Sequence, residues 1–408
     1  MIRHLLKLVW NRRKTNALII AEIFLAFLVV FAVMCTAVTM TNRWAYGTLD
    51  PRSTGDRSLG FDWHDVYVAS VEAPRELMDS PEAGKELRAT SARLLEGVQQ
   101  TPGVVAASAA ITPPYGFSTI EDTFSAEERR GIGVLNDAVS DDYAKVMQIR
   151  ILRGRWFGRE DDAATYVPAV LDTNAARGIF GDADPLGQTF RGGSDRKLVY
   201  RVVGIIAPFR LHGEMAEAQP MLFHRATRDA MVENVVLRVP PGTPPAFEAA
   251  LAARLQAIGP QLSFRIRRMD DMRRNALRFS MTPVVAGAVV CFFLITMVGL
   301  GLTGVLWQDV TKRTREIGLR RATGASSRAV LFQVIGEVLL LTTIAVLAAS
   351  ILIAQLPILG AFTLMSRQAY SAGIIAALAS IYALTLLCAL YPSWLASRLR
   401  PAEALRYE

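Results

Sequence analysis

The stretch TKRTREIGLRRATGAS, residues 311–326, is basic and polar, and it lies between two long apolar runs. A helix that crosses a bilayer needs roughly 20 mostly apolar residues, and four windows meet this requirement: 17–41, 283–307, 329–357 and 372–395. The quoted stretch therefore connects the second predicted span to the third. This pattern predicts an α-helical membrane protein with four transmembrane helices.

The composition agrees with a protein that lies partly in a membrane and partly in water. The chain has 408 residues, 51% of them hydrophobic, and a formal net charge of +8. It is too apolar for an ordinary soluble enzyme and too charged for a bundle made only of lipid-buried helices. Residues 42–282, between the first two spans, are polar enough to form a water-facing domain, and residues 358–371 form a short loop.

Lysine and arginine are concentrated on one side of the predicted spans. Basic residues occur before the first span, in the loop 308–328 and in the tail 396–408, whereas the loop 358–371 contains only Arg367. Short cytoplasmic loops carry such an excess, and long domains escape the rule. We therefore expect both termini and the loop 308–328 to be cytoplasmic, and residues 42–282 to be extracytoplasmic.

The chain's first 16 residues are predicted to form an amphipathic helix in the cytoplasmic headgroup layer, and a merely basic lead-in is the alternative. The first span resembles a signal peptide in its basic flank, but its apolar core is longer than the usual roughly 7–15 residues and lacks a small-residue cleavage site. We expect an uncleaved anchor. The cysteines, Cys35, Cys291 and Cys388, fall within spans, so the exported domain must be stable without disulfides.

The exported region contains two strand–helix–strand units. The first comprises residues 64–71, 83–100 and 103–111, and the second comprises residues 233–239, 244–258 and 261–267. Together they predict one mixed sheet backed by two helices, a split βαβ arrangement. The whole region is therefore expected to be an α+β domain.

Residues 113–230 are predicted to form a lobe inserted into this split βαβ, porter-like subdomain. The lobe should be mainly β, with a short helix at 173–180 and strands at 166–171, 187–191, 197–207 and 220–223. Residues 269–282 are helical in character and lead directly into the second span, so we expect a rigid stalk there.

Recognisable catalytic and nucleotide-binding motifs are missing from the sequence. It has no G-x-x-x-x-G-K-[ST] phosphate loop, no G-x-S-x-G elbow and no H-E-x-x-H pair. We predict no catalytic residues, no metal and no directly bound cofactor. A metal site was considered at four polar residues close in sequence, but surface-loop residues explain them better because nothing fixes them on one face: His212, Glu214, Glu217 and His224.

Two carboxylates, Glu22 and Glu337, fall inside predicted spans. A carboxylate in hydrocarbon costs roughly 2.5 kcal/mol or more unless it is paired or near the interface. Both lie toward the cytoplasmic end, where snorkelling or pairing explains them better than an ion pathway. The nearby glycines of VGLGLTG, residues 298–304, permit close helix contacts, either within one protomer or at a dimer seam.

The basic stretch itself is predicted to contain a short helix. Thr311 can cap its start, and Gly324 suits a left-handed C-terminal position. Glu316 and Arg320 are one turn apart and can pair. Such a helix is either a lipid-hugging connector or a docking element for a soluble motor, and charge alone does not decide between them.

The stretch KRTREIGLRRATGAS, followed by LFQVIGEVLLL, resembles the signature of the MacB/FtsX-like permeases of ABC transporters. That pattern is close to R-x-x-E-I-G-x-x-[KR]-A-x-G-A, with a glutamate early in the next span. The tail YPSWLASRLRPAEALRYE and the exported stretches LRGRWFGREDD, DADPLGQTF and YRVVGI are also similar to this family. The residues that match the pattern are Arg313, Glu316, Ile317, Gly318, Arg321, Ala322, Gly324 and Ala325, with Glu337 in the next span.

The resemblance implies a dimeric permease of the bacterial inner membrane, whose loop 308–328 acts as a coupling helix against an ABC ATPase. MacB carries its own nucleotide-binding domain, whereas this sequence has no phosphate loop. We therefore expect ATP and Mg²⁺ to be bound by a separate ATPase subunit. The second permease is either another copy or a related chain. Export of peptides, antibiotics or other amphiphiles, with a periplasmic adaptor and an outer-membrane duct, is the leading expectation. An FtsX-like regulator of a cell-wall partner or a lipoprotein-releasing permease is the alternative.

Overall fold

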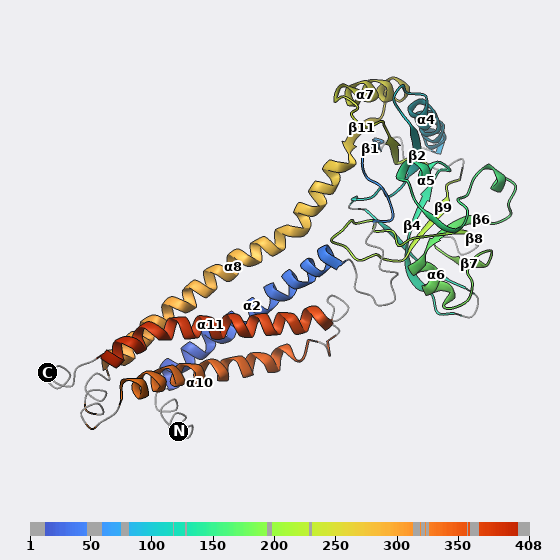
Figure 1. Ribbon diagram of the computed structural model, residues 1–408. Helices are drawn as coiled ribbons and strands as arrows, with labels where there is room; N and C mark the ends of the chain where they lie inside the picture. The colour runs from blue at the N-terminus through green and yellow to red at the C-terminus, as the bar shows by residue number, and fades with distance from the viewer. Residues whose placement is uncertain are drawn as a thin grey trace. The chain divides into compact units, whose positions relative to one another are not determined.

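The computed structural model describes residues 13–46, 59–74, 81–116, 118–126, 129–193, 198–227, 231–312, 319, 323, 326–356, 358–359 and 367–398. The chain divides into two compact units: residues 1–42 with 281–408, and residues 43–280 (Figure 1). The predicted N-terminal helix falls largely outside the described residues.

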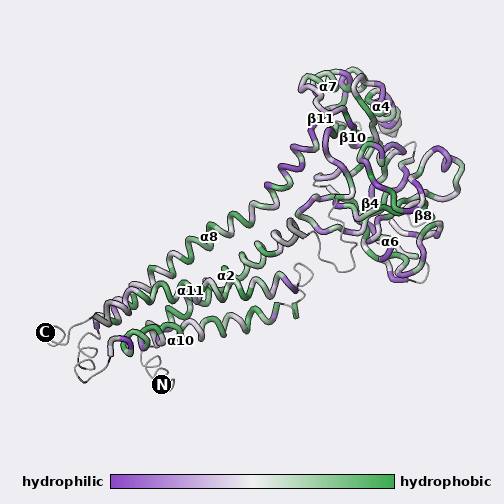
Figure 2. Tube along the Cα trace, viewed as in Figure 1, coloured by the Kyte–Doolittle hydropathy of each residue, from purple (hydrophilic) through white to green (hydrophobic). Residues whose placement is uncertain are grey.

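The first unit is a bundle of long apolar helices. It contains α2 (Arg13–Tyr46), α10 (Ser327–Ile353), α11 (Arg367–Arg398) and the later part of α8 (Met269–Lys312). Each of the four helices is long and apolar enough to cross a membrane. Figure 2 shows mostly apolar colouring along them, whereas the start of α8 is more hydrophilic. The prediction of four membrane helices joined to an extracytoplasmic domain that contains both helices and strands is confirmed.

The bundle packs around α2. Its residues Ile23, Phe27 and Val30 have no exposed surface, and they share one core with side chains of α8, α10 and α11. An added Cβ at Gly373 of α11 would overlap Cys35 of α2, so glycine is required for this close approach. Helices α10 and α11 are also joined by polar contacts, because the Thr343 hydroxyl lies 2.9 Å from the Tyr382 hydroxyl.

The second unit contains a four-stranded sheet with strand order β11-β1-β10-β2. Its strands are β1 (Val66–Glu72), β2 (Ala106–Ala110), β10 (Asn234–Arg238) and β11 (Ser263–Arg268). The predicted mixed sheet is wrong, since every pairing is antiparallel. The two strand–helix–strand units interleave: β10 of the second unit lies between β1 and β2, which run in the same direction but do not touch.

Both faces of this sheet are covered. Helices α4 (Pro81–Gln99) and α7 (Ala246–Ile258) lie side by side on one face, and the short helix α5 (Tyr143–Met147) packs against β2 and β10 (Figure 1). Alternate residues of β1 accordingly belong to different cores, with Val68 in one and Ala69 in the other. Double-sided burial explains why β1 is apolar on both faces.

The inserted lobe is built on a seven-stranded sheet with order β5-β8-β6-β9-β4-β3-β7, and β7 also pairs with β8. The first part of β8 pairs with β7 and its last part with β5, so six of the strands close into a ring that leaves few open edges. The elements are β3 (Ile120–Ser125), β4 (Ile132–Val139), β5 (Ile151–Gly154), β6 (Val167–Asp172), α6 (Thr173–Phe180), β7 (Thr189–Gly192), β8 (Val199–Ile206) and β9 (Met221–Arg225).

The two lobes share one hydrophobic core, which joins Val68 and Val236 of the four-stranded sheet to Phe223 of the inserted lobe. Polar groups complete the junction. The carboxylate of Asp137, fully buried in β4, accepts hydrogen bonds from the backbone nitrogens of Ile111 (2.8 Å) and Thr112 (3.2 Å), and burial raises its pKa to about 7. The lobes are therefore packed together as one domain and are not two independent domains.

Arg238 is the strongest polar tie at this junction. Its buried guanidinium donates to the carbonyl oxygens of Val146 (2.7 Å), His64 (2.8 Å) and Asp62 (2.8 Å). Each of these acceptors would lose a partner if the side chain were removed.

We predict that Arg238→Ala lowers the free energy of unfolding of this domain by about 3 kcal/mol, since the buried Val146 carbonyl and the part-buried carbonyls of His64 and Asp62 all lose their donor. Arg265→Ala, which removes an exposed ion pair with Glu72 at 2.8 Å, should cost less than about 1 kcal/mol. Thermal unfolding of the detergent-solubilised chain measures both. Equal losses in the two variants would contradict this role of Arg238.

Candidate functional site

The predicted coupling residues between 313 and 325 lie outside the described residues, but the helices that flank them are defined. Helix α8 ends at Lys312, and α10 begins after Ser326, whose hydroxyl accepts a hydrogen bond from the Ala329 backbone nitrogen at 3.2 Å. Thr311 does not cap a new helix as predicted. It lies in the last turn of α8 and donates to the Trp307 carbonyl at 2.8 Å, because the apolar helix continues further than the composition change indicated.

The two intramembrane carboxylates contact different neighbours. The Glu337 carboxylate on α10 accepts a hydrogen bond from Gln333 one turn earlier, at 3.2 Å. The half-buried Glu22 side chain of α2 lies against α8, where both its carboxylate oxygens are 3.0 Å from the position that a Cβ would take on Gly301. A Cβ at position 301 would therefore force the Glu22 carboxylate to shift by a few tenths of an ångström.

The glycines of residues 298–304 have different surroundings. A Cβ on Gly299 would meet Cys388 at 3.5 Å and Leu384 at 3.6 Å, and Gly301 faces Glu22, so these two serve packing within the chain. At Gly304, no atom of the described residues lies within 4 Å of the added Cβ position. The first two glycines therefore belong to intrachain packing.

The start of α8 is anchored firmly in the extracytoplasmic domain. Strand β11 ends at Arg268 and α8 begins at Met269, with no residue between them. Met269 and Met272 are buried in the core that the two lobes share. The same helix continues to Lys312 in the other unit, so one continuous helix links the domain to a membrane span.

Arg273 adds an electrostatic tie between α8 and the inserted lobe. Its Nε lies 2.5 Å from Oε1 of Glu214, which is in the segment between β8 and β9, and its guanidinium stacks over the Trp63 ring at 4.6 Å. Burial opposes the charged form, but the hydrogen bond and charge of Glu214 raise the pKa of Arg273. Arg273 therefore remains charged across the physiological range.

The four residues considered for a metal take separate places. Glu214 pairs with Arg273, and His224 lies on β9 against the Tyr200 ring. Burial lowers the pKa of both His212 and His224. Within the described ranges, no group of three or more His, Cys, Asp or Glu side chains is arranged to hold a metal ion. Sequence reasoning missed Arg273 as an anchoring residue, because its partner Glu214 is 59 positions away.

Four helices that are long and apolar enough to cross a membrane, one of which continues from an α/β domain, define a membrane protein with a large water-facing domain. Residues 36–254 match the family model described as MacB-like periplasmic core domain, and residues 288–401 match that of the FtsX-like permease C-terminal region. The chain belongs to the MacB/FtsX-like family of ABC permeases, as its sequence motifs suggested.

Similar proteins include the macrolide export ATP-binding/permease protein MacB of Bordetella avium, 28% identical over 72% of this chain and 47% of that protein. MacB of Bdellovibrio bacteriovorus is 26% identical over 79% of this chain and 53% of that protein. The chain therefore spans about half the length of these curated relatives.

Among solved structures, the periplasmic region of MacB from Actinobacillus actinomycetemcomitans aligns with a TM-score of 0.39 and 13% identity, over 53% of this chain and 94% of that one. The extracellular domain of the noncanonic ABC-type transporter YknZ from Gram-positive bacteria aligns with a TM-score of 0.36 and 13% identity, over 49% of this chain and 99% of that one.

We predict that Gly301→Leu destabilises the membrane bundle by about 1–3 kcal/mol, since the new side chain must displace Glu22. Gly304→Leu, whose position is open, should cost much less. Adding Glu22→Ala to Gly301→Leu should recover part of the loss. Thermal unfolding in detergent measures all three, and equal destabilisation by the two glycine variants would refute the contact.

Proposed function

We propose that the chain is the permease subunit of an ABC transporter and that it converts ATP hydrolysis by a separate ATPase subunit into movement of its extracytoplasmic domain. ATP and Mg²⁺ are bound by that ATPase, and the loop 308–328 is the coupling element that contacts it. Both termini and this loop lie on the cytoplasmic side, as the distribution of lysine and arginine favours. The permease works as a dimer, with a second copy or a related chain.

The match to the FtsX-like permease region carries this proposal, because residues 288–401 include both helices that flank the coupling motif. The anchoring of α8 supports it physically. A helix buried at one end in the periplasmic domain and continuous with a membrane span transmits displacement without a flexible linker. Met269, Met272 and the Arg273–Glu214 pair would make both lobes follow α8 together.

The output is export of peptides, antibiotics or other amphiphiles, in which the periplasmic domain acts with an adaptor and an outer-membrane duct. The names of the two MacB relatives, which describe macrolide export, favour this class over the alternative of an FtsX-like regulator or a lipoprotein-releasing permease. Copurification of an adaptor supports export, whereas copurification of a cell-wall hydrolase supports regulation.

We predict that Glu316→Lys abolishes stimulation of the partner ATPase by the permease, because it reverses the charge at the centre of the coupling motif. Glu248→Lys makes the same change of charge in the extracytoplasmic domain, outside the coupling loop, and should leave the stimulation intact. Both variants are reconstituted in lipid nanodiscs with the ATPase. Binding of the ATPase to the nanodiscs and release of phosphate are measured. Full stimulation of the ATPase by Glu316→Lys would contradict the assignment of the coupling element.

A further inference from the structure

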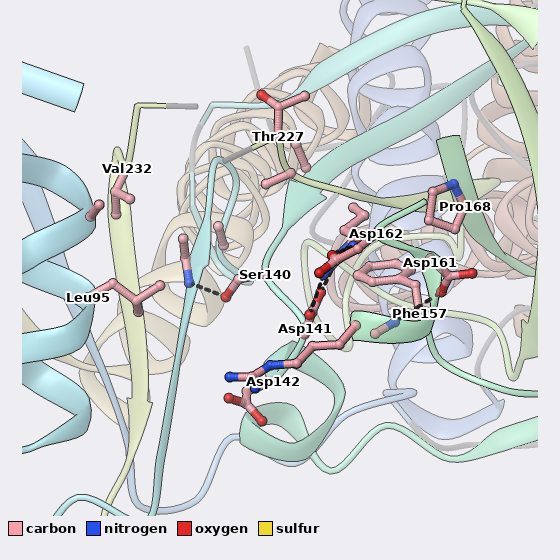
Figure 3. Close-up of a pocket in the computed structure, with 18 of the residues that line it drawn as sticks. Leu95, Ser140, Asp141, Asp142, Phe157, Asp161, Asp162, Pro168, Thr227 and Val232 are labelled. Carbon is pink, nitrogen blue, oxygen red and sulfur yellow. Dashed lines mark hydrogen bonds and ion pairs between the residues drawn. The ribbon is translucent and has the colours of Figure 1, made fainter. Parts of the chain in front are cut away.

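A cavity of about 1190 Å³ lies in the extracytoplasmic domain where the two lobes meet (Figure 3). One wall comes from α4, β2 and the residues before β10, and the other comes from the ends of β4 and β9 and the segment before β6. The lobes are fixed to each other by a common core and by Arg238. The cavity is thus a preformed feature of the domain.

The wall from the inserted lobe is acidic. Six carboxylates and two guanidinium groups line the cavity, so the difference is four negative charges. Arg225 engages two of the carboxylates, with its Nε 2.7 Å from Asp141 and its NH1 2.6 Å from Asp162. Arg155, outside the lining, is bidentate to Asp161 at 2.7 and 2.8 Å. Arg155 also lies 3.1 Å from Glu160, so among the described residues only Glu96 and Asp142 of the lining carboxylates form no ion pair.

These remaining carboxylates lie on both sides of the cavity. Glu96 belongs to α4 and Asp142 precedes α5, and both are exposed. A charged group on a bound molecule could therefore meet a carboxylate from either lobe. An excess of one sign in a concave site raises the local concentration of opposite charge.

The wall from the four-stranded sheet's lobe is mainly apolar, with Glu96 and Gln99 as its polar residues. Figure 3 shows Leu95 and Val232 on one side of the cavity, opposite Asp141 and Asp162. Met231 and Ile111 extend this apolar surface. A ligand that fits must present apolar groups to one side and positive charge to the other.

We propose that this cavity, the interlobe cleft, binds a segment of a partner polypeptide in which lysine or arginine alternates with apolar residues. Its volume exceeds the roughly 300–1000 Å³ that is usual for sites of drug-sized ligands. An extended segment places successive side chains on opposite sides, which matches an acidic wall facing an apolar one. This interaction goes beyond coupling to the ATPase and does not require it.

The test uses the full chain in nanodiscs of zwitterionic lipid, without the ATPase, and a fluorescent peptide of alternating lysine and leucine. Anisotropy measures binding, and empty nanodiscs correct for partition into lipid. We expect saturable binding that weakens with added salt. A peptide with glutamate in place of lysine and one with serine in place of leucine should not bind.

Charge reversal locates the binding. Glu96→Lys combined with Asp142→Lys should lower the affinity for the peptide roughly tenfold or more. The matched pair Asp182→Lys and Glu248→Lys makes the same change of charge outside the cleft, and it should alter affinity by less than about twofold. Both double variants must retain the wild-type unfolding temperature, which is expected because none of the four positions is buried.

Two results would overturn the inference. One is equal binding to the two double variants, which would place the peptide elsewhere. The other is displacement of the peptide by an equal concentration of octylamine, which would identify the occupant as a small cationic amphiphile. Because no ATPase is present, loss of peptide binding says nothing against the coupling role, and failure of the Glu316→Lys test leaves the cleft unaffected.

Discussion

The structure depends on one covalent constraint: an edge strand of the extracytoplasmic sheet passes into a membrane helix without a single intervening residue. Strand β11 ends at Arg268, and α8 runs from Met269 to Lys312. Because Met269 and Met272 are buried in the domain core, the first turn of α8 cannot move without moving that core. The Arg273–Glu214 pair extends the same restriction to the inserted lobe.

The packing of the lobes and of the helices follows two different physical rules. In the water-facing domain, apolar burial joins the lobes, and buried polar groups such as Asp137 and Arg238 satisfy the backbone at the junction. In the membrane bundle, close approach depends on small residues, as at Gly373 against Cys35 and at Gly301 against Glu22. A rigid outer body and a closely packed bundle are both suited to transmitting displacement, and a preformed interlobe cleft is suited to holding a partner.

Much of this fold could be predicted from sequence, since long apolar windows and alternating strand patterns are local signals. The helix at 173–180 was predicted with the bounds of α6. Strand β3 was missed because IEDTFS is mostly polar, and β4 because Asn136 and Asp137 interrupt its apolar pattern. The prediction of a mixed sheet was wrong, and the sheet is antiparallel. Its strand order comes from the interleaving of two separate strand–helix–strand units, which neither unit specifies alone.

Some features of the candidate sites could be predicted from the sequence, and others could not. Glu22 and Glu337 were found because a carboxylate in an apolar window is conspicuous, but the fit of Glu22 against Gly301 needed the packing of α2 on α8. The Arg273–Glu214 pair and the interlobe cleft join residues far apart in sequence, and no local pattern indicates them. The coupling motif is a sequence inference that rests on resemblance, and its residues between 313 and 325 lie outside the described ranges.

The most direct test of the account is a spin-label distance measurement across the two lobes, with labels at Arg88 on α4 and Asp182 in the inserted lobe, in a cysteine-free chain reconstituted with its ATPase. The account predicts that this distance is unchanged between the nucleotide-free and ATP-trapped states, since both lobes move with α8 as one body. A change of several ångströms between the two states would show that the lobes separate, and would contradict it.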